Sequence, residues 1–318
     1  MSPFRWDFLF VLICSKLLIY IRKRDSTTGG KIRVKIDAVF SGGGIKGYAF
    51  LGTMASLEKK GFSIERVAGT SAGAIFASLL AAGYHYQDLE KILDDLDLQN
   101  LLDPPRITNY IPFSKWIFLY FQMGLYKGDK FEEWVYDHLA RKKIFTFKDV
   151  RHDYLKVIVS DLSLGKMVVI PDDLKRVYNI DPAKFSVAKA VRMSAGFPYF
   201  FMPKKVTGKN NIESLIVDGG LLSNFPLWVF DNGHKLKRPV LGVKISDETS
   251  NIETDHIKNA IDMFTHLFST MKTAHDARYV SKNKEHQIIF IPVKDVNTMD
   301  FKITKNTKEY LINTGKCQ

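Results

Sequence analysis

Two glycine-rich turns, each between a short apolar run and a helical pattern, constrain the fold of this chain more than any other sequence feature. The apolar run VKIDAVF at 34–40 precedes the turn SGGGIKG at 41–47, and a helical pattern follows. The next predicted strand, 65–70, leads into the pentapeptide GTSAG at 69–73 and a helix of small residues. Strands joined through a helix normally run parallel in one sheet. The pattern therefore predicts an α/β fold with a mostly parallel central sheet flanked by helices.

Apolar runs and helical patterns alternate along the rest of the chain, without an internal repeat. Short apolar runs bounded by turn residues are typical of buried strands, and apolar residues at helical spacing are typical of helices. No linker-like stretch interrupts the chain after Lys31, so we expect one domain over residues 31–318. Further strands are predicted at 155–160, 167–170, 215–217, 240–245 and 287–291, and helices at 48–60, 72–82, 88–96, 130–140, 187–193 and 256–280.

Residues 1–30 form a separate segment with an apolar stretch. Residues 8–21 read FLFVLICSKLLIYI and precede the basic cluster Arg22, Lys23 and Arg24. This stretch is shorter than the roughly 20 residues that span a bilayer. Three interpretations remain: a helix packed on the main domain, an interfacial membrane anchor, or a signal anchor. A polar linker follows up to residue 30.

The charge balance favours an anionic partner. The chain has 46 Lys and Arg against 34 Asp and Glu, which gives a net charge of +12. Nucleic acid and an anionic membrane both fit such a charge, but no RNA- or DNA-binding motif is present. The two cysteines, Cys14 and Cys317, exclude a disulfide framework and favour a reducing compartment. The charge alone does not choose between these two partners, nucleic acid and membrane.

The pentapeptide at 69–73 places Ser71 in the position of a catalytic nucleophile. In the G-x-S-x-G pattern, Gly69 and Gly73 allow a sharp strand-to-helix turn that exposes the serine hydroxyl. Acyl transfer also needs N–H donors for the tetrahedral oxyanion. The first glycine-rich turn can supply them from Gly43 and Gly44. The two turns together indicate an acyl-transfer enzyme.

The first turn taken alone has another interpretation. Gly42, Gly44 and Gly47 match the dinucleotide-binding pattern G-x-G-x-x-G. Such a site also uses an acidic residue at the end of the second strand, whereas Glu65 lies at its start and the serine turn occupies its end. Nucleotide binding is therefore disfavoured. Lys46, inside the turn, either attracts an anionic headgroup or is a solvated surface residue.

A serine hydroxyl needs a base to become a good nucleophile. Asp218 is the candidate, because it follows the apolar run at 215–217 and precedes Gly219 and Gly220 at the end of a strand, where α/β proteins bind ligands. An isolated Asp-Gly pair is also an ordinary turn signal. A Ser–Asp–His arrangement stays an alternative, although no histidine sits in a recognisable motif; the histidines after Asp218 are His234, His256, His266, His275 and His286.

Taken in chain order, three motifs resemble those of the patatin-like phospholipase family. They are GGGIKG at 42–47, GTSAG at 69–73 and DGG at 218–220. The stretch MSAGFPYFF at 193–201 and the tripeptide NFP at 224–226 are similar to further blocks of the family. Neither the serine nor the aspartate position departs from the family pattern.

The resemblance covers about residues 36–317 and implies a fold, an activity and a set of site residues. The implied activity is hydrolysis of fatty-acyl esters in lipids, of the phospholipase A or lysophospholipase type. The implied catalytic dyad is Ser71 as nucleophile and Asp218 as base, without histidine. The turn of Gly42, Gly43 and Gly44 is implied as the oxyanion hole, with motif support from Lys46, Gly47, Gly69, Gly73, Gly219 and Gly220.

The expected partner is therefore a membrane lipid and not a nucleic acid. We expect a cytoplasmic protein that is peripheral to or anchored at an anionic membrane. No cofactor or metal is expected, because the histidines lack metal-ligand spacing and no calcium-loop pattern occurs. The aromatic-rich segment 101–126 has two interpretations: a core-packing insertion, or a lid or surface that dips into lipid headgroups. A catalytically silent lipid-binding module is the alternative from a different functional class.

Overall fold

The computed structural model describes residues 34–105, 119–208, 211–231, 238–247, 287–294 and 300–316, with short stretches at 257, 263, 266–271, 274 and 296–298. The N-terminal segment, residues 106–118 and most of the helix predicted at 256–280 therefore lie outside the described residues. No helix in the described ranges is long and apolar enough to cross a membrane.

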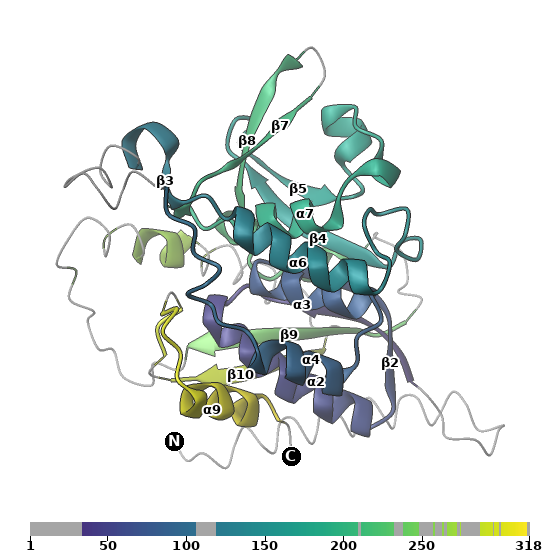
Figure 1. Ribbon diagram of the computed structural model, residues 1–318. Helices are drawn as coiled ribbons and strands as arrows, with labels where there is room; N and C mark the ends of the chain where they lie inside the picture. The colour runs from purple at the N-terminus through teal and green to yellow at the C-terminus, as the bar shows by residue number, and fades with distance from the viewer. Residues whose placement is uncertain are drawn as a thin grey trace.

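An eight-stranded sheet forms the centre of the protein (Figure 1). Its order is β10-β9-β1-β2-β4-β8-β7, and β5 also pairs with β4. The pairs from β10 to β4 are parallel, whereas β5, β7 and β8 pair antiparallel, so the expected α/β fold is confirmed with a mixed, mostly parallel sheet. The strands are β1 (Val34–Phe40), β2 (Phe62–Thr70), β4 (Leu155–Asp161), β5 (Lys166–Ile170), β7 (Lys204–Thr207), β8 (Glu213–Asp218), β9 (Val240–Asp247) and β10 (Gln287–Val293).

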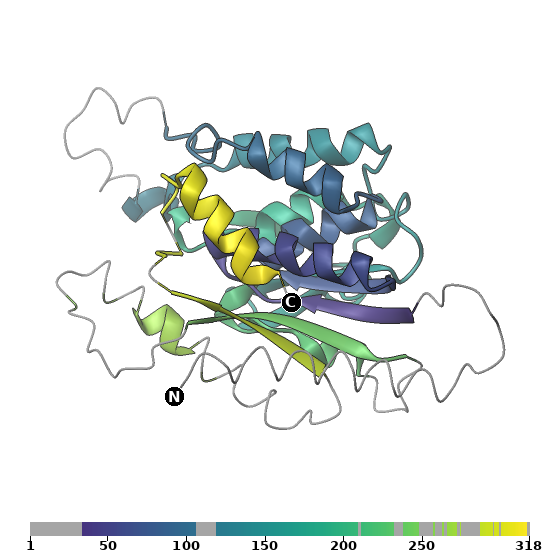
Figure 2. The same cartoon turned by 90° about the horizontal axis from the view of Figure 1, so that it is seen from below.

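Helices cover one face of this sheet, as Figure 2 shows for α2, α4, α6 and α9. The large hydrophobic core lies between helices and sheet, and a smaller cluster around Phe225 and Phe230 packs on strand residues such as Val39 and Ala68. Five predicted helices are confirmed with small shifts at their ends, and α9 was not predicted. The helices are α2 (Ala49–Lys59), α3 (Ala72–Ala81), α4 (Tyr86–Asp94), α6 (Asp129–Arg141), α7 (Val187–Ser194) and α9 (Lys305–Gly315); a 3₁₀ turn, η1 (Gly44–Tyr48), precedes α2.

The C-terminal helix α9 packs against α2 at two glycines. A Cβ on Gly52 would lie 2.0 Å from the Ile312 carbonyl oxygen, and one on Gly315 would lie 1.8 Å from the Ala49 carbonyl oxygen. The Thr53 hydroxyl donates a hydrogen bond of 3.1 Å to the carbonyl of Gly315. This close packing holds the C-terminal part of the chain beside the helix that follows the first glycine-rich turn.

A two-stranded sheet, β3 (Gly124–Tyr126) with β6 (Tyr199–Phe201), connects the start of α6 to the segment after α7. The fully buried Arg192 guanidinium fastens this junction by donating to the carbonyls of Gly128, Lys127 and Met202. Burial lowers the pKa of Arg192 to about 10, so it stays charged at neutral pH. The junction positions the residues of segment 195–201 that face the site.

Candidate active site

Two strands of the sheet meet end to end at the site. On one edge of β4, Ile158 pairs with Thr70, the last residue of β2, and the next residue, Val159, pairs with Asp218, the last residue of β8. The opposite edge of β4 is occupied by β5 at these positions. Because β2 is parallel and β8 antiparallel to β4, their carboxyl ends face each other. Ser71, which follows Thr70, is thus brought close to Asp218 by strand pairing.

Ser71 occupies the sharp turn between β2 and α3. Its backbone has φ 54° and ψ −121°, a conformation that residues with a side chain rarely adopt and that clusters at functional sites. A Cβ on Gly69 would lie 2.2 Å from the Gly73 carbonyl oxygen, and one on Gly73 would lie 2.3 Å from the Phe40 carbonyl oxygen. The strand, the turn and the helix therefore approach so closely that both flanking positions require glycine.

Ser194, the last residue of α7, holds this turn in place. Its Oγ accepts a hydrogen bond of 3.0 Å from the Ser71 N–H and donates one of 2.6 Å to the Ile158 carbonyl. The fully buried hydroxyl thus links α7, the serine turn and the point of β4 where the two strands meet. Ser194 belongs to the stretch at 193–201, and no local sequence pattern predicts this contact.

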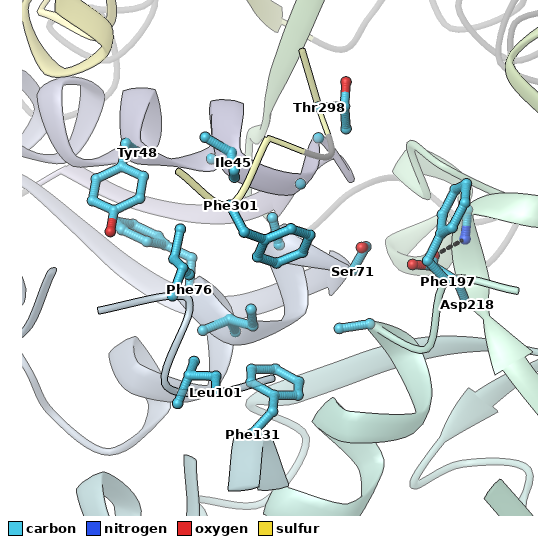
Figure 3. Close-up of a pocket in the computed structure, with 18 of the residues that line it drawn as sticks. Ile45, Tyr48, Ser71, Phe76, Leu101, Phe131, Phe197, Asp218, Thr298 and Phe301 are labelled. Carbon is cyan, nitrogen blue, oxygen red and sulfur yellow. Dashed lines mark hydrogen bonds between the residues drawn. The ribbon is translucent and has the colours of Figure 1, made fainter. Parts of the chain in front are cut away.

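The Asp218 carboxylate is buried and is oriented by the loop that follows β8. Its Oδ1 accepts a hydrogen bond of 2.7 Å from the Gly220 N–H, the bond drawn in Figure 3. Gly219 has no room for a side chain, because its Cβ would lie 2.2 Å from the Ile158 carbonyl oxygen. The two glycines therefore act differently: Gly219 allows β8 to approach β4, and Gly220 orients the carboxylate.

The first glycine-rich turn presents main-chain N–H groups beside Ser71. The Gly42 N–H donates a hydrogen bond of 2.9 Å to the Asn224 carbonyl, whereas the N–H groups of Gly43 and Gly44 make no hydrogen bond with any described residue. Gly43 and Gly44 line the same cavity as Ser71. These two N–H groups can therefore donate hydrogen bonds to a ligand atom bound at the serine.

A segment near the C-terminus completes the turn. The Thr298 carbonyl accepts a hydrogen bond of 3.2 Å from the Ile45 N–H, and a Cβ on Gly44, whose φ is 53°, would lie 2.3 Å from that same oxygen. Phe301 lines the cavity and stacks on Phe200 with 4.8 Å between ring centroids. Neither Thr298 nor Phe301 was expected at the site, because both are far from the motifs along the chain.

An apolar cavity extends from Ser71 into the helical layer (Figure 3). The cavity has a volume of about 170 Å³. In the view of Figure 3, Ser71 and Asp218 lie at one side, and Tyr48 and Leu101 at the other. Such a lining binds a hydrocarbon chain through the hydrophobic effect. Its apolar side chains include Ile75, Phe76, Leu79, Leu93, Leu96, Leu98, Phe131, Trp134, Phe197, Phe201 and Phe268.

The remaining expected site residues are placed as follows. Gly47 lines the cavity, and a Cβ there would lie 2.9 Å from that of Ala72. Lys46 is only 7% exposed, so the interpretation as a solvated surface residue is wrong, and it does not line the cavity. Of the five histidines considered as bases, only His266 belongs to the described residues, and it does not line the cavity either. In the part of the chain described, no group of three or more His, Cys, Asp or Glu side chains could hold a metal ion.

The fold and the site define an α/β protein with a serine on a strand–helix turn and an aspartate beside it at an apolar cavity. The chain belongs to the patatin-like phospholipase family, whose model matches residues 38–231. The matched range includes both glycine-rich turns and Asp218, and it ends before β9, β10, Thr298 and Phe301.

The chain is also similar to further proteins and to a solved structure. The uncharacterized protein YqhO of Bacillus subtilis is 45% identical over 281 residues, which cover 88% of this chain and 95% of that protein. The uncharacterized protein R571 of Acanthamoeba polyphaga mimivirus is 24% identical over 293 residues, which cover 88% and 90% of the two chains. The crystal structure of VipD from Legionella pneumophila matches 89% of this chain and 65% of its own, with a TM-score of 0.52 and 17% identity, which shows a shared fold.

Proposed function

We propose that this protein hydrolyses fatty-acyl esters of lipids through a dyad of Ser71 and Asp218. The observation that carries the proposal is the meeting of β2 and β8 on one edge of β4, which brings the two residues to the same apolar cavity. The apolar lining suits a fatty-acyl chain, so that an ester carbonyl at its end can reach the serine. A phospholipase A or lysophospholipase type of cleavage fits this arrangement.

In the proposed reaction, Asp218 accepts the hydroxyl proton as the Ser71 oxygen attacks the ester carbonyl carbon. The N–H groups of Gly43 and Gly44 stabilise the negative charge that develops on the carbonyl oxygen. The tetrahedral intermediate then collapses, Asp218 returns the proton to the leaving alcohol or lysolipid, and an acyl ester on Ser71 remains. Water that loses its proton to Asp218 attacks this ester, and the fatty acid leaves as Ser71 recovers its proton.

The test compares three proteins, the parent, Ser71→Ala and Asp218→Asn, on long-chain phosphatidylcholine and on a soluble ester. Ser71→Ala should have no turnover above background, and Asp218→Asn should lower kcat by about 10²–10⁴-fold, as expected for loss of a general base. Asp231→Asn is the matched control, because this carboxylate is exposed and does not line the cavity. Turnover at the parental rate in either dyad variant would disprove the dyad.

The two alternatives predict different results in the same assays. A Ser–Asp–His esterase would lose activity in one of the single alanine variants of His234, His256, His266, His275 and His286, whereas the dyad predicts parental rates in all five. A silent lipid-binding module would show no Ser71-dependent turnover and no labelling of Ser71 by a fluorophosphonate probe, although it would still bind lipid.

A further inference from the structure

Exposed apolar side chains gather beside the cavity at one edge of the molecule, and we propose that they dock on a lipid surface with anionic headgroups. This inference rests on the proposed function, because it names the surface from which the ester would enter. The docking rim, as we call it, has two parts. It consists of Tyr120, Phe121, Met123 and Tyr199, and of Met263, Leu267 and Met271.

The first part of the rim lies next to the small sheet of β3 and β6. Tyr120 and Phe121 are 80% and 73% exposed, and their ring centroids are 5.0 Å apart. The strand that follows, β3, pairs Tyr126 with Phe201, whose side chain lines the cavity. The interpretation of this segment as core packing is therefore wrong for Tyr120 and Phe121, which extend outward from the cavity wall.

The second part of the rim is on a helical stretch at 266–271. Within this stretch, Leu267 and Met271 are four residues apart and so belong to one face, and Met263 precedes the stretch; all three are about half exposed. Phe268 faces inward: it is buried, lines the cavity and lies 4.7 Å from the Phe197 ring. In Figures 1 and 2 this stretch and residues 119–122 lie on the same side of the molecule.

The position of the rim favours lipid as its partner. A fatty-acyl chain that crosses water on its way to the cavity exposes every methylene, and a rim in contact with the bilayer avoids that cost. A protein partner seated there would cover the side of the cavity from which we propose that the ester enters. Tyrosine also suits a headgroup interface, since its ring is apolar and its hydroxyl polar.

Charge supports an anionic lipid surface. Lys127 directly follows Tyr126 of β3 and Lys302 directly follows Phe301, and both lysines are exposed. The nearby Asp129 and Asp300 are exposed as well, so the support comes from the charge of the whole chain. The chain as a whole carries a net charge of +12. Basic residues close to an anionic membrane are attracted to it, and salt weakens the attraction.

The experiment measures co-sedimentation of the full chain with vesicles, in a Ser71→Ala background so that hydrolysis plays no part. Vesicles of phosphatidylcholine with phosphatidylglycerol are compared with phosphatidylcholine alone. The parent should bind the anionic vesicles more tightly, and Tyr120→Ser with Phe121→Ser should weaken this binding roughly tenfold or more, because two large apolar side chains no longer insert. Leu267→Ser with Met271→Ser tests the second part of the rim in the same way.

The matched control is Tyr136→Ser with Phe145→Ser, another exposed tyrosine–phenylalanine pair, with 5.9 Å between ring centroids. Tyr136 lies in α6 and Phe145 after its C-terminal end, whereas β3 precedes its N-terminal end. The control should bind as the parent does. The proposal is overturned if the parent does not bind vesicles, or if the control loses as much affinity as both rim pairs. Vesicle binding that depends on the rim, without any Ser71-dependent ester hydrolysis, would refute the proposed function and leave the docking rim in place.

Discussion

The main-chain N–H of Ser71 and the side-chain oxygen of Ser194 are joined by a hydrogen bond of 3.0 Å. The bond holds the peptide of a residue whose φ is 54°. The same hydroxyl donates to the Ile158 carbonyl, next to the point where Asp218 ends β8. The orientation of the proposed nucleophile therefore depends on a helix that is distant from it along the chain.

Ser194→Ala should lower kcat about tenfold with little change in KM, because the Ser71 peptide loses the acceptor that orients it. Ser194→Thr keeps the hydroxyl and should recover much of the rate. Ser78→Ala is the matched control: Ser78 is also fully buried and donates to a carbonyl, that of Ile75 within the same helix α3, and it does not line the cavity. Steady-state kinetics on a soluble ester measure all three variants, and equal rates for Ser194→Ala and Ser78→Ala would contradict the positioning role.

Alanine at Gly44 should be far more harmful than alanine at Gly43. Gly44 has a positive φ, and a Cβ there would clash with the main-chain oxygen of Thr298. A Cβ on Gly43 would instead lie 2.4 Å from the end of the flexible Ile245 side chain. If the Gly44 N–H binds the oxyanion, displacing it should cost about 10²–10³-fold in kcat. Gly43→Ala should cause a smaller loss in kcat, and Ile245→Val should restore the rate because it removes the methyl group that contacts the new Cβ.

The control for this comparison is Gly83→Ala. Gly83 also has a positive φ, of 83°, but a Cβ there would contact nothing within 4 Å. The variant should lose about 1–2 kcal/mol in free energy of unfolding from backbone strain and keep the parental kcat. Comparable activity of Gly44→Ala and Gly83→Ala would show that strain alone, and not the position of the turn, matters.

Leu101→Trp should shorten the preferred acyl chain. Leu101 lies across the cavity from Ser71 in Figure 3, so a larger side chain there occupies the space for the end of a long chain. Each buried methylene contributes about 0.8 kcal/mol, and exclusion of two or three should lower kcat/KM for long esters by tenfold or more while short esters are unaffected. Esters of increasing chain length provide the measurement. Leu102→Trp, at a neighbour that does not line the cavity, should keep the parental profile; identical profiles for the two variants would contradict the assignment.

Tyr178 should make the stability of the fold sensitive to alkaline pH. Its hydroxyl donates a hydrogen bond of 2.8 Å to the buried Asp161 carboxylate. Burial first, and then Asp161, raise the pKa of Tyr178 above its usual value of about 10. A pKa raised by folding gives stability that is complete below about pH 10 and is lost as the pH rises further.

Tyr178→Phe should therefore reduce the decline in free energy of unfolding above about pH 10. It should also cost about 1–3 kcal/mol at neutral pH, because Asp161 loses a buried donor. Denaturant unfolding over this pH range is the measurement, and the exposed Tyr136→Phe should follow the parent. Parallel curves for Tyr178→Phe and the parent would contradict the prediction.

Local patterns predicted most elements around the site. The apolar run at 34–40 coincides with β1, and the helix after Ser71 begins at Ala72 as expected, because strand alternation and glycine turns are encoded by neighbouring residues. The strands β3, β6 and β7 and the helix α9 were missed; β3 and β6 have only three residues each, and the other two were missed for a physical reason. β7 is a four-residue strand that includes Lys204 and Lys205, and α9 buries only a few of its residues, so neither carries a clear apolar period.

The amino-acid order was enough to identify the two glycine-rich turns, the aspartate after a strand, and the alternation that produces an α/β sheet, since all of these depend on short-range geometry. It did not reveal that β2 and β8 end against consecutive residues of β4, that Ser194 holds the serine turn, or that Thr298 and Phe301 complete the site. These contacts arise from strand register and side-chain packing between distant segments, and they form only when the whole sheet and its helical layer assemble.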